Sequence, residues 1–140
     1  MGTITSINCV TGDVTTYEPP APTLEESQAA MLAQLAAIRY RRETGGIVVS
    51  GVPVATDRES QAIVDRIVKA YDDGDITGDV DFKSPGGWVS IGEATIRTIK
   101  AAGAQHVQAC FSRERTLSTA ITNSEDHDDL DLIDMEAGWP

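Results

Sequence analysis

The feature that most constrains the fold is a stretch of about 28 residues, from Gly92 to Ile121, that favours one uninterrupted helix. Four of its positions, Ile96, Gly103, Cys110 and Leu117, are spaced by sevens, but Glu114 falls on the companion stripe of Val107 and Ile121. The pattern therefore predicts a long packed helix rather than a regular coiled coil.

The first 22 residues predict a β-hairpin arm on a stiff connector. Residues Thr3–Val10 and Val14–Tyr17 are β-like and flank turn-forming residues. The prolines at positions 19, 20 and 22 then prevent regular pairing, because each fixes its own φ and restricts the residue before it.

A second helix is expected from Thr23 to about Glu43. Thr23 and Glu26 have the spacing of a capping box, and Gly45-Gly46 would end the helix. Its apolar residues Leu24, Met31 and Ile38 are seven apart, with Leu35 beside them, on an otherwise Gln-, Glu- and Ala-rich surface. Such a stripe packs on one side only, either onto its own domain or onto a neighbouring copy.

The middle of the chain predicts two more hairpins and a helix. Strands are expected at Ile47–Val49 and Val52–Ala55, and at Asp81–Lys83 and Trp88–Ile91, with a helix from Arg58 to about Tyr71 that is capped by Asp57. Its apolar positions are Ala62, Ile63, Ile67, Val68 and Tyr71. Because the connections are too short for parallel crossovers, the fold class is α+β, with short antiparallel hairpins packed against two or three helices. The expected core comprises Ile63, Ile67, Trp88, Ile96, Ile99, Val107 and Phe111.

Charge divides the chain unevenly. The formal net charge is −11, and residues 125–140 hold seven acids and no base. We therefore divide the chain into an arm (1–22), an α+β domain (23–124) and an acidic C-terminal segment (125–140), which can form a short final helix within Glu125–Glu136. The basic cluster of Arg39, Arg41 and Arg42 would complement a helix dipole, so no nucleic-acid partner is expected. Without a signal peptide or apolar span, we expect a soluble protein with no membrane partner.

Two clusters invite a chemical interpretation. Residues Asp73–Asp81 match part of a calcium-binding loop, but Ser84 replaces the closing carboxylate, which favours a solvated turn. His106 and Cys110 are four apart on one helical face, but two ligands do not complete a zinc site, and packing is the simpler interpretation. Cys9 and Cys110 are expected to be reduced thiols, with a disulfide possible. We predict no catalytic residues, no metal site and no cofactor, and hence no enzyme.

Several local choices resemble an uncharacterised small domain that recurs in tailed-bacteriophage tail-fibre, baseplate and tail-assembly proteins. The similarity covers about residues 39–121 and the last eight residues, and no motif within it carries known chemistry. The segments that carry it are Arg41–Glu43, Gly46–Gly51, Thr56–Ser60, Phe82-Lys83, Gly87-Trp88, His106–Phe111 with Glu114 and Leu117, and Ile133–Pro140.

The resemblance implies a structural virion component, made in the host cytoplasm and placed in the tail, that binds other tail proteins and forms a homo-oligomer. An alternative is a tail-fibre assembly chaperone that is absent from the finished particle. The exposed arm and the apolar helix stripe are the expected partner-binding elements, although the arm can instead fold back onto its own domain. Their residues are Ile4, Ile7, Val10, Tyr17, Leu24, Met31 and Ile38.

Overall fold

The computed structural model describes residues 4–7, 14–17 and 19–140. Strands β1 (Ile4–Ile7) and β2 (Val14–Tyr17) pair antiparallel, with Ile4 opposite Tyr17, and an extended segment leads from position 19 to the first helix. These two strands lie within the segments predicted for the arm, and Val10 and the residues predicted to form the turn lie outside the described residues.

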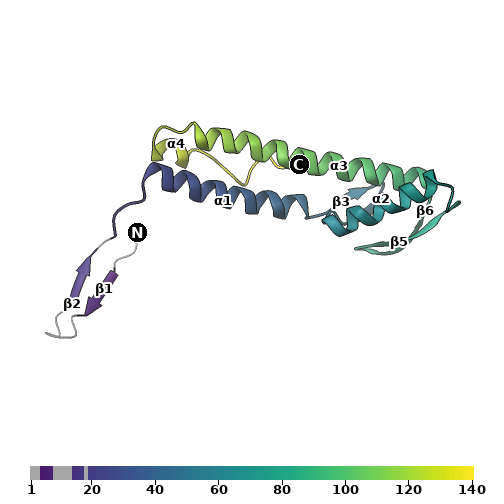
Figure 1. Cartoon of the computed structure of the whole chain (residues 1–140), viewed down its shortest axis with the longest axis horizontal. Helices are drawn as coiled ribbons and strands as arrows, with labels where there is room; N and C mark the ends of the chain where they lie inside the picture. The colour runs from purple at the N-terminus through teal and green to yellow at the C-terminus, as the bar shows by residue number, and fades with distance from the viewer. Residues whose placement is uncertain (1–3, 8–13, 18) are drawn as a thin grey trace.

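Two long antiparallel helices form an elongated stem (Figure 1). These helices are α1 (Leu24–Glu43) and α3 (Glu93–Thr122), which is 30 residues long and so rises about 45 Å. Thr23 caps α1 as predicted, since its hydroxyl accepts a hydrogen bond from the Glu26 backbone N–H at 3.2 Å. The buried stripe of α3 runs through Ile96, Gly103, Cys110 and Leu117, the positions that are seven apart in the sequence.

The elements between α1 and α3, together with the first part of α3, form a head at one end of the stem (Figure 1). It contains β3 (Ile47–Val49), β4 (Val52–Val54), α2 (Arg58–Asp72), β5 (Val80–Ser84) and β6 (Gly87–Ile91). We call residues 44–104 the head, and residues 23–43 with 105–140 the stem. Both hairpins are antiparallel, so the predicted α+β class with hairpins packed against helices is confirmed.

Local chemistry explains the connections in the head. Ser50 and Gly51 both have positive φ, 51° and 79°, which is the left-handed pair that a two-residue hairpin turn requires. Helix α2 begins at its Asp57 cap and ends in a Schellman motif, in which Gly74 (φ 75°) and Asp75 donate to the carbonyls of Tyr71 and Ala70.

Each part of the molecule has its own apolar core. In the head, Val64 and Val68 of α2 pack with strand residues and with Ile96 and Ile99 of α3. In the stem, Leu35 packs with Leu117, Ile121 and Leu130, and Leu24 and Met31 border this cluster. The α1 stripe therefore packs within its own chain, and Ile38 is only 9% exposed.

The acidic C-terminal segment also packs on the stem. Its helix α4 (His127–Asp131) is shorter than the predicted final helix, and the chain then runs back along α1 and α3. Leu130 is buried, and Ile133, Met135 and Trp139 cover the stem core. The segment that charge sets apart in the sequence is thus joined to the stem by apolar contacts.

Three residues expected in the core are not there. Ile63 is 46% exposed, Trp88 72% and Phe111 41%, while Ile67 and Val107 are half-buried, and Ile96 and Ile99 are fully buried as predicted. Along α2 the buried pair is Val64 and Val68, one position beyond the predicted pair of isoleucines. In the β5–β6 hairpin, Trp88 lies opposite Lys83, so it shares the outer face with that lysine.

Candidate functional site

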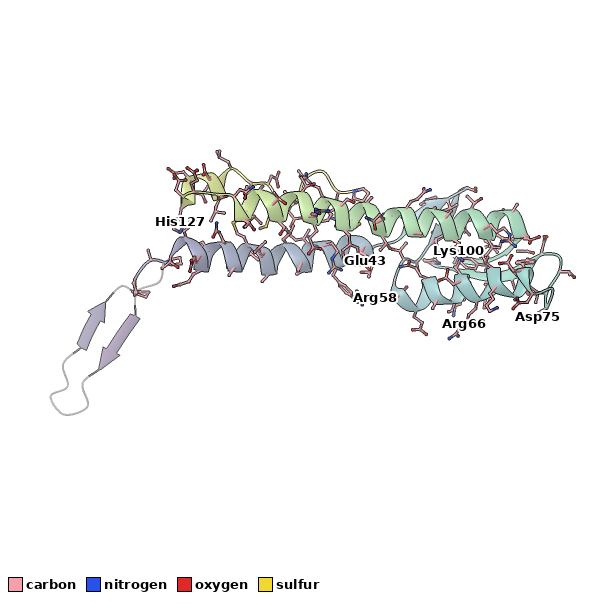
Figure 2. The ribbon with its side chains drawn as sticks, turned by 45° about the horizontal axis from the view of Figure 1, so that its top comes forward. Glu43, Arg58, Arg66, Asp75, Lys100 and His127 are labelled. Atoms are coloured by element: carbon pink, nitrogen blue, oxygen red, sulfur yellow. The ribbon has the colours of Figure 1, made fainter. Side chains whose placement is uncertain are left out.

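The junction between stem and head is held by a buried carboxylate. Glu43, at the end of α1, is 3% exposed and pairs with Arg39 one turn earlier and with Arg58 of α2 at 3.8 Å. Arg39 also pairs with Glu114 of α3 at 2.6 Å, and its guanidinium lies 4.5 Å from the Phe111 ring centroid. Burial acts to lower the pKa of Arg39, but the hydrogen bonds that Arg39 donates to Glu114 and Glu43 outweigh it and raise that pKa. These pairs join three helices, as Figure 2 shows around Glu43 and Arg58.

A buried hydroxyl completes the junction. Thr56 donates to the Glu43 carbonyl at 2.6 Å, accepts from the Gly46 backbone N–H at 2.9 Å, and its own carbonyl accepts from the Gln61 amide at 2.7 Å. Every partner of Thr56 is therefore an internal group of the fold. We interpret the junction as a structural element that fixes the head on the stem.

The residues that could carry chemistry, His106, Cys110 and the acidic loop, make contacts within the fold. The Cys110 sulfur lies 3.8 Å from His106 Nε2, but that nitrogen also lies 2.9 Å from the Arg42 carbonyl oxygen. Burial, followed by the charge of Glu43, raises the pKa of the Cys110 thiol, which disfavours the nucleophilic thiolate. In the acidic loop, Asp73 caps α2 and pairs with Lys69 at 2.8 Å. The described residues contain no group of three or more His, Cys, Asp or Glu that could hold a metal ion.

The arginines at the end of α1 meet the acidic segment instead of a free surface. Arg41 and Arg42 contact the Glu136 carboxylate at 3.1 and 3.4 Å, and Arg113 donates to the Ala137 carbonyl at 3.0 Å. The C-terminal segment therefore pairs with the basic cluster, although the Arg41 and Arg42 side chains remain exposed.

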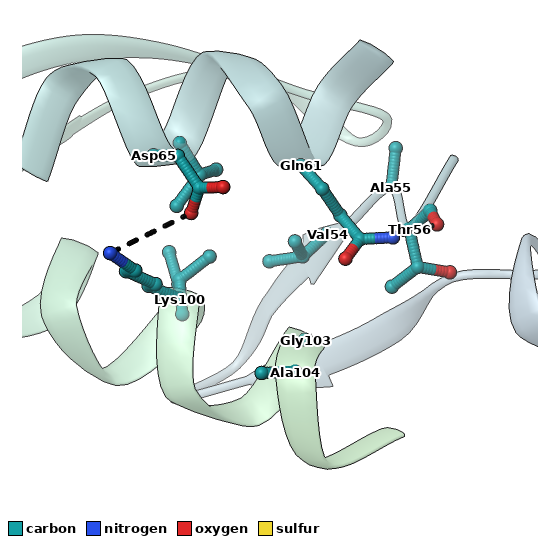
Figure 3. A pocket seen from close by; sticks show the side chains of 10 residues that line it. Val54, Ala55, Thr56, Gln61, Asp65, Lys100, Gly103 and Ala104 are labelled. Atoms are coloured by element: carbon teal, nitrogen blue, oxygen red, sulfur yellow. Dashed lines mark hydrogen bonds and ion pairs between the residues drawn. The ribbon is translucent and has the colours of Figure 1, made fainter. Parts of the chain in front are cut away.

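Two hollows in the head flank α2. The first, of about 210 Å³, lies between α2 and α3 above β4 (Figure 3). Gly103 and Ala104 supply its small-residue side, and a Cβ added at Gly103 would meet no atom within 4 Å. At its rim Asp65 and Lys100 form an ion pair at 3.8 Å. This hollow can accept an apolar group beside a charged rim.

The second hollow, also about 210 Å³, lies between α2 and the β5–β6 hairpin, and we call it the groove. It joins Ile63 to Trp88, so two of the residues wrongly expected in the core line one exposed surface. The groove residues are Ala55, Ser60, Ile63, Ile67, Asp81, Phe82, Lys83 and Trp88. Exposed aromatic and aliphatic side chains gathered in one hollow are typical of a protein-binding surface.

The predicted partner-binding residues lie elsewhere. Leu24, Met31 and Ile38 are on α1, where Ile38 is buried and the other two lie half-buried against the stem core, so binding of a partner through this stripe stays a prediction. Ile4, Ile7 and Tyr17 lie on the arm strands, and Val10 lies outside the described residues, so binding through the arm stays a prediction. The signal for the groove was present in the sequence as period-2 alternation, because Trp88 and Ser90 alternate with Val89 and Ile91.

One comparison with known proteins finds a match, and this match covers most of the chain. In the part of the chain that the structure describes, no helix has the length and apolar character to cross a membrane. No curated protein and no solved structure matches the chain. The family model described as "Domain of unknown function (DUF4376)" matches residues 26–135, which includes all but the first two residues of α1, the head, α3, α4 and the start of the returning C-terminal segment. The chain therefore belongs to the DUF4376 family.

Proposed function

We propose that this protein is a structural component of a tailed-bacteriophage tail, in the baseplate or tail-fibre region, and that it acts by binding other tail proteins. The observation that carries this proposal is the separation of two binding elements along the stem. The groove lies in the head, and the β-hairpin arm is attached through residues 19–22 to the opposite end of α1.

The stem suits a protein that connects partners. Helix α3 alone rises about 45 Å, and the Glu43 junction fixes the head on the helices with paired charges. A short hairpin such as β1–β2 is marginal in water by itself, so it gains stability by adding to another sheet or surface. A spacer with a proposed binding element at each end is the arrangement expected of a protein that connects components of an assembly.

The resemblance to phage tail proteins gives the biological setting, and the charge of −11 suits a protein that stays dispersed until it meets its partners. The same charge also suits the alternative, a tail-fibre assembly chaperone that leaves before the particle is complete. A structural component stays in the finished particle and a chaperone does not, so the protein content of purified particles distinguishes the two functions.

Quantitative mass spectrometry of gradient-purified particles, from the phage or prophage that encodes the chain, tests this proposal. We expect the protein at a fixed copy number per particle, and we expect deletion of residues 1–22 to lower that number. Its absence from particles, together with its presence on unassembled fibres in the lysate, would contradict a virion role and favour the chaperone.

A further inference from the structure

The groove carries an inference about its occupant. Ile63 and Trp88 stand on two different elements, α2 and β6, and both leave about half or more of their surface in water. Surface that is both apolar and concave is costly to leave hydrated, and Trp is the residue type most enriched at the energetic centre of protein interfaces. The groove is therefore suited to an occupant that covers both side chains together.

The charges beside these residues indicate what that occupant is. Asp81 and Lys83 are two apart on β5, so both project from the same face of the hairpin, and both line the groove. Among the described residues neither forms an ion pair, and the Lys83 ammonium lies 5.8 Å from the Trp88 ring centroid. One positive and one negative charge thus lie beside the apolar residues of the groove, and neither has an ion-pair partner among the described residues.

We propose that the groove is a two-fold interface between two copies of this chain. Around a two-fold axis that passes between Asp81 and Lys83, the same patch meets itself in the opposite direction, so Asp81 of one copy faces Lys83 of the other, and the reverse. The apolar centre, Ile63 and Trp88, is covered at the same time. The charges of the patch are therefore complementary to those of a second copy of the same patch. This complementarity favours a copy of the same chain over an unrelated partner.

The neutral balance of the groove matters because the chain as a whole carries a net charge of −11. Two such molecules repel each other over most of their surfaces, and contact is favoured where charges cancel. The patch is smaller than a standard interface of about 800 Å² per partner, so the dimer is expected to be weak and to depend on concentration. The inference goes beyond the proposed tail function and does not depend on it.

Sedimentation equilibrium of the full chain over a wide concentration range is the first test. The wild type should show a monomer–dimer equilibrium, and Trp88→Ala should weaken it at least about tenfold. Val48→Ala is the matched control, because Val48 is 70% exposed in the same head but lies outside the groove. Circular dichroism should show all three proteins equally folded, since both substitutions are at exposed positions.

Charge exchange supplies the second test, and it does not depend on truncating a large side chain. Asp81→Lys makes both flanking charges positive, and Lys83→Asp makes both negative, so each variant alone should associate about tenfold more weakly than the wild type. Mixing the two variants should restore association as a heterodimer, since each copy then meets the opposite charges. The double variant with both substitutions should again form a homodimer.

Three results would overturn the proposal. They are a wild type that stays monomeric at every concentration, a dimer that Trp88→Ala leaves unchanged, and a mixture of Asp81→Lys with Lys83→Asp that associates no better than either alone. A dimer that only the deletion of residues 1–22 abolishes would assign self-association to the arm and would equally contradict the groove interface. None of these results bears on whether the protein is found in particles.

Discussion

The apolar stripe of α1 and the groove of the head differ in how far their apolar side chains are buried. Leu24, Met31 and Ile38 form a regular apolar stripe that the sequence allows to pack on its own domain or on a neighbouring copy, and in the structure Ile38 is buried while the other two border the stem core. Ile63 and Trp88 are large apolar residues that suggest a core, and they are exposed together. The difference shows that periodicity identifies an apolar face reliably, whereas burial of that face depends on which other segments of the chain reach it.

The segment that reaches the α1 stripe comes from the far end of the chain. Residues 130–139 bring Leu130, Ile133, Met135 and Trp139 onto the stem core, almost a hundred positions from the α1 residues that they cover. Among the residues that the structure describes, no comparable segment reaches the outer side of the β5–β6 hairpin. One apolar surface is therefore closed by the chain itself, and the other is exposed in the described structure.

The largest expected effect is a difference in stability between two truncations, one in the stem core and one in the groove. Leu35 is 1% exposed in the stem core, so Leu35→Ala should lower the free energy of unfolding by about 2–5 kcal/mol, because it leaves a cavity. Trp88→Ala, although it removes a larger side chain, should change it by less than about 0.5 kcal/mol in dilute solution. Urea denaturation followed by circular dichroism measures both. Equal destabilisation by the two substitutions would remove the distinction between the surfaces.

The charge junction should show the next largest effect. Glu43→Gln keeps the shape of the side chain but removes the charge that Arg39 and Arg58 share, so we expect a loss of about 2 kcal/mol. Glu136→Gln is the control, because its pairs with Arg41 and Arg42 are exposed and are worth about 0–1 kcal/mol. Thermal unfolding of both variants tests this, and a larger loss for Glu136→Gln would contradict a junction centred on Glu43.

The N-cap of α2 should show the smallest of these three effects, and that effect should depend on pH. Hydrogen bonds from the Ser60 hydroxyl and the Ser60 backbone N–H lower the pKa of Asp57. Because the folded-state pKa lies below the unfolded value of about 3.9, the cap stabilises the protein above that pH and loses its contribution as the pH falls through the folded-state pKa.

Asp57→Ala should therefore cost about 1 kcal/mol at pH 7, and the difference from the wild type should shrink as the pH falls below about 4. Asp57→Asn, which keeps the capping oxygen without the charge, should lose less than Asp57→Ala at pH 7 and should lack the pH dependence that Asp57 confers. Urea denaturation at several pH values measures this. A gap that is constant from pH 7 to pH 3 would show that the Asp57 carboxylate makes no pH-dependent contribution.

Much of the fold could be predicted because its signals are local. Thr23 and Asp57 cap their helices, Ser50-Gly51 makes a turn, and the seven-residue spacing of Ile96, Gly103, Cys110 and Leu117 marks the buried face of α3. Each of these depends on residues within a few turns of one another, so the sequence contains all the information required.

The candidate site could be predicted only in part. In α2, Ile63 with Ile67 and Val64 with Val68 are both i, i+4 pairs, so helical spacing alone cannot select the buried one, and contact with β4, β5 and α3 decides it. Trp88 is expected in the core because it is large and apolar, but its register opposite Lys83 places it on the outer face of the hairpin. The closure of the stem by residues 130–139 is a long-range contact that no local pattern specifies.

The fluorescence of Trp88 tests the central claim most directly, namely that the groove is an exposed surface that another molecule covers. In a Trp139→Phe background, Trp88 is the remaining tryptophan of the chain. In dilute solution its emission and its quenching by acrylamide should approach those of the urea-unfolded protein, and both should shift toward a buried tryptophan as the concentration rises. Blue-shifted, protected emission at every concentration would place Trp88 in the core and contradict the account.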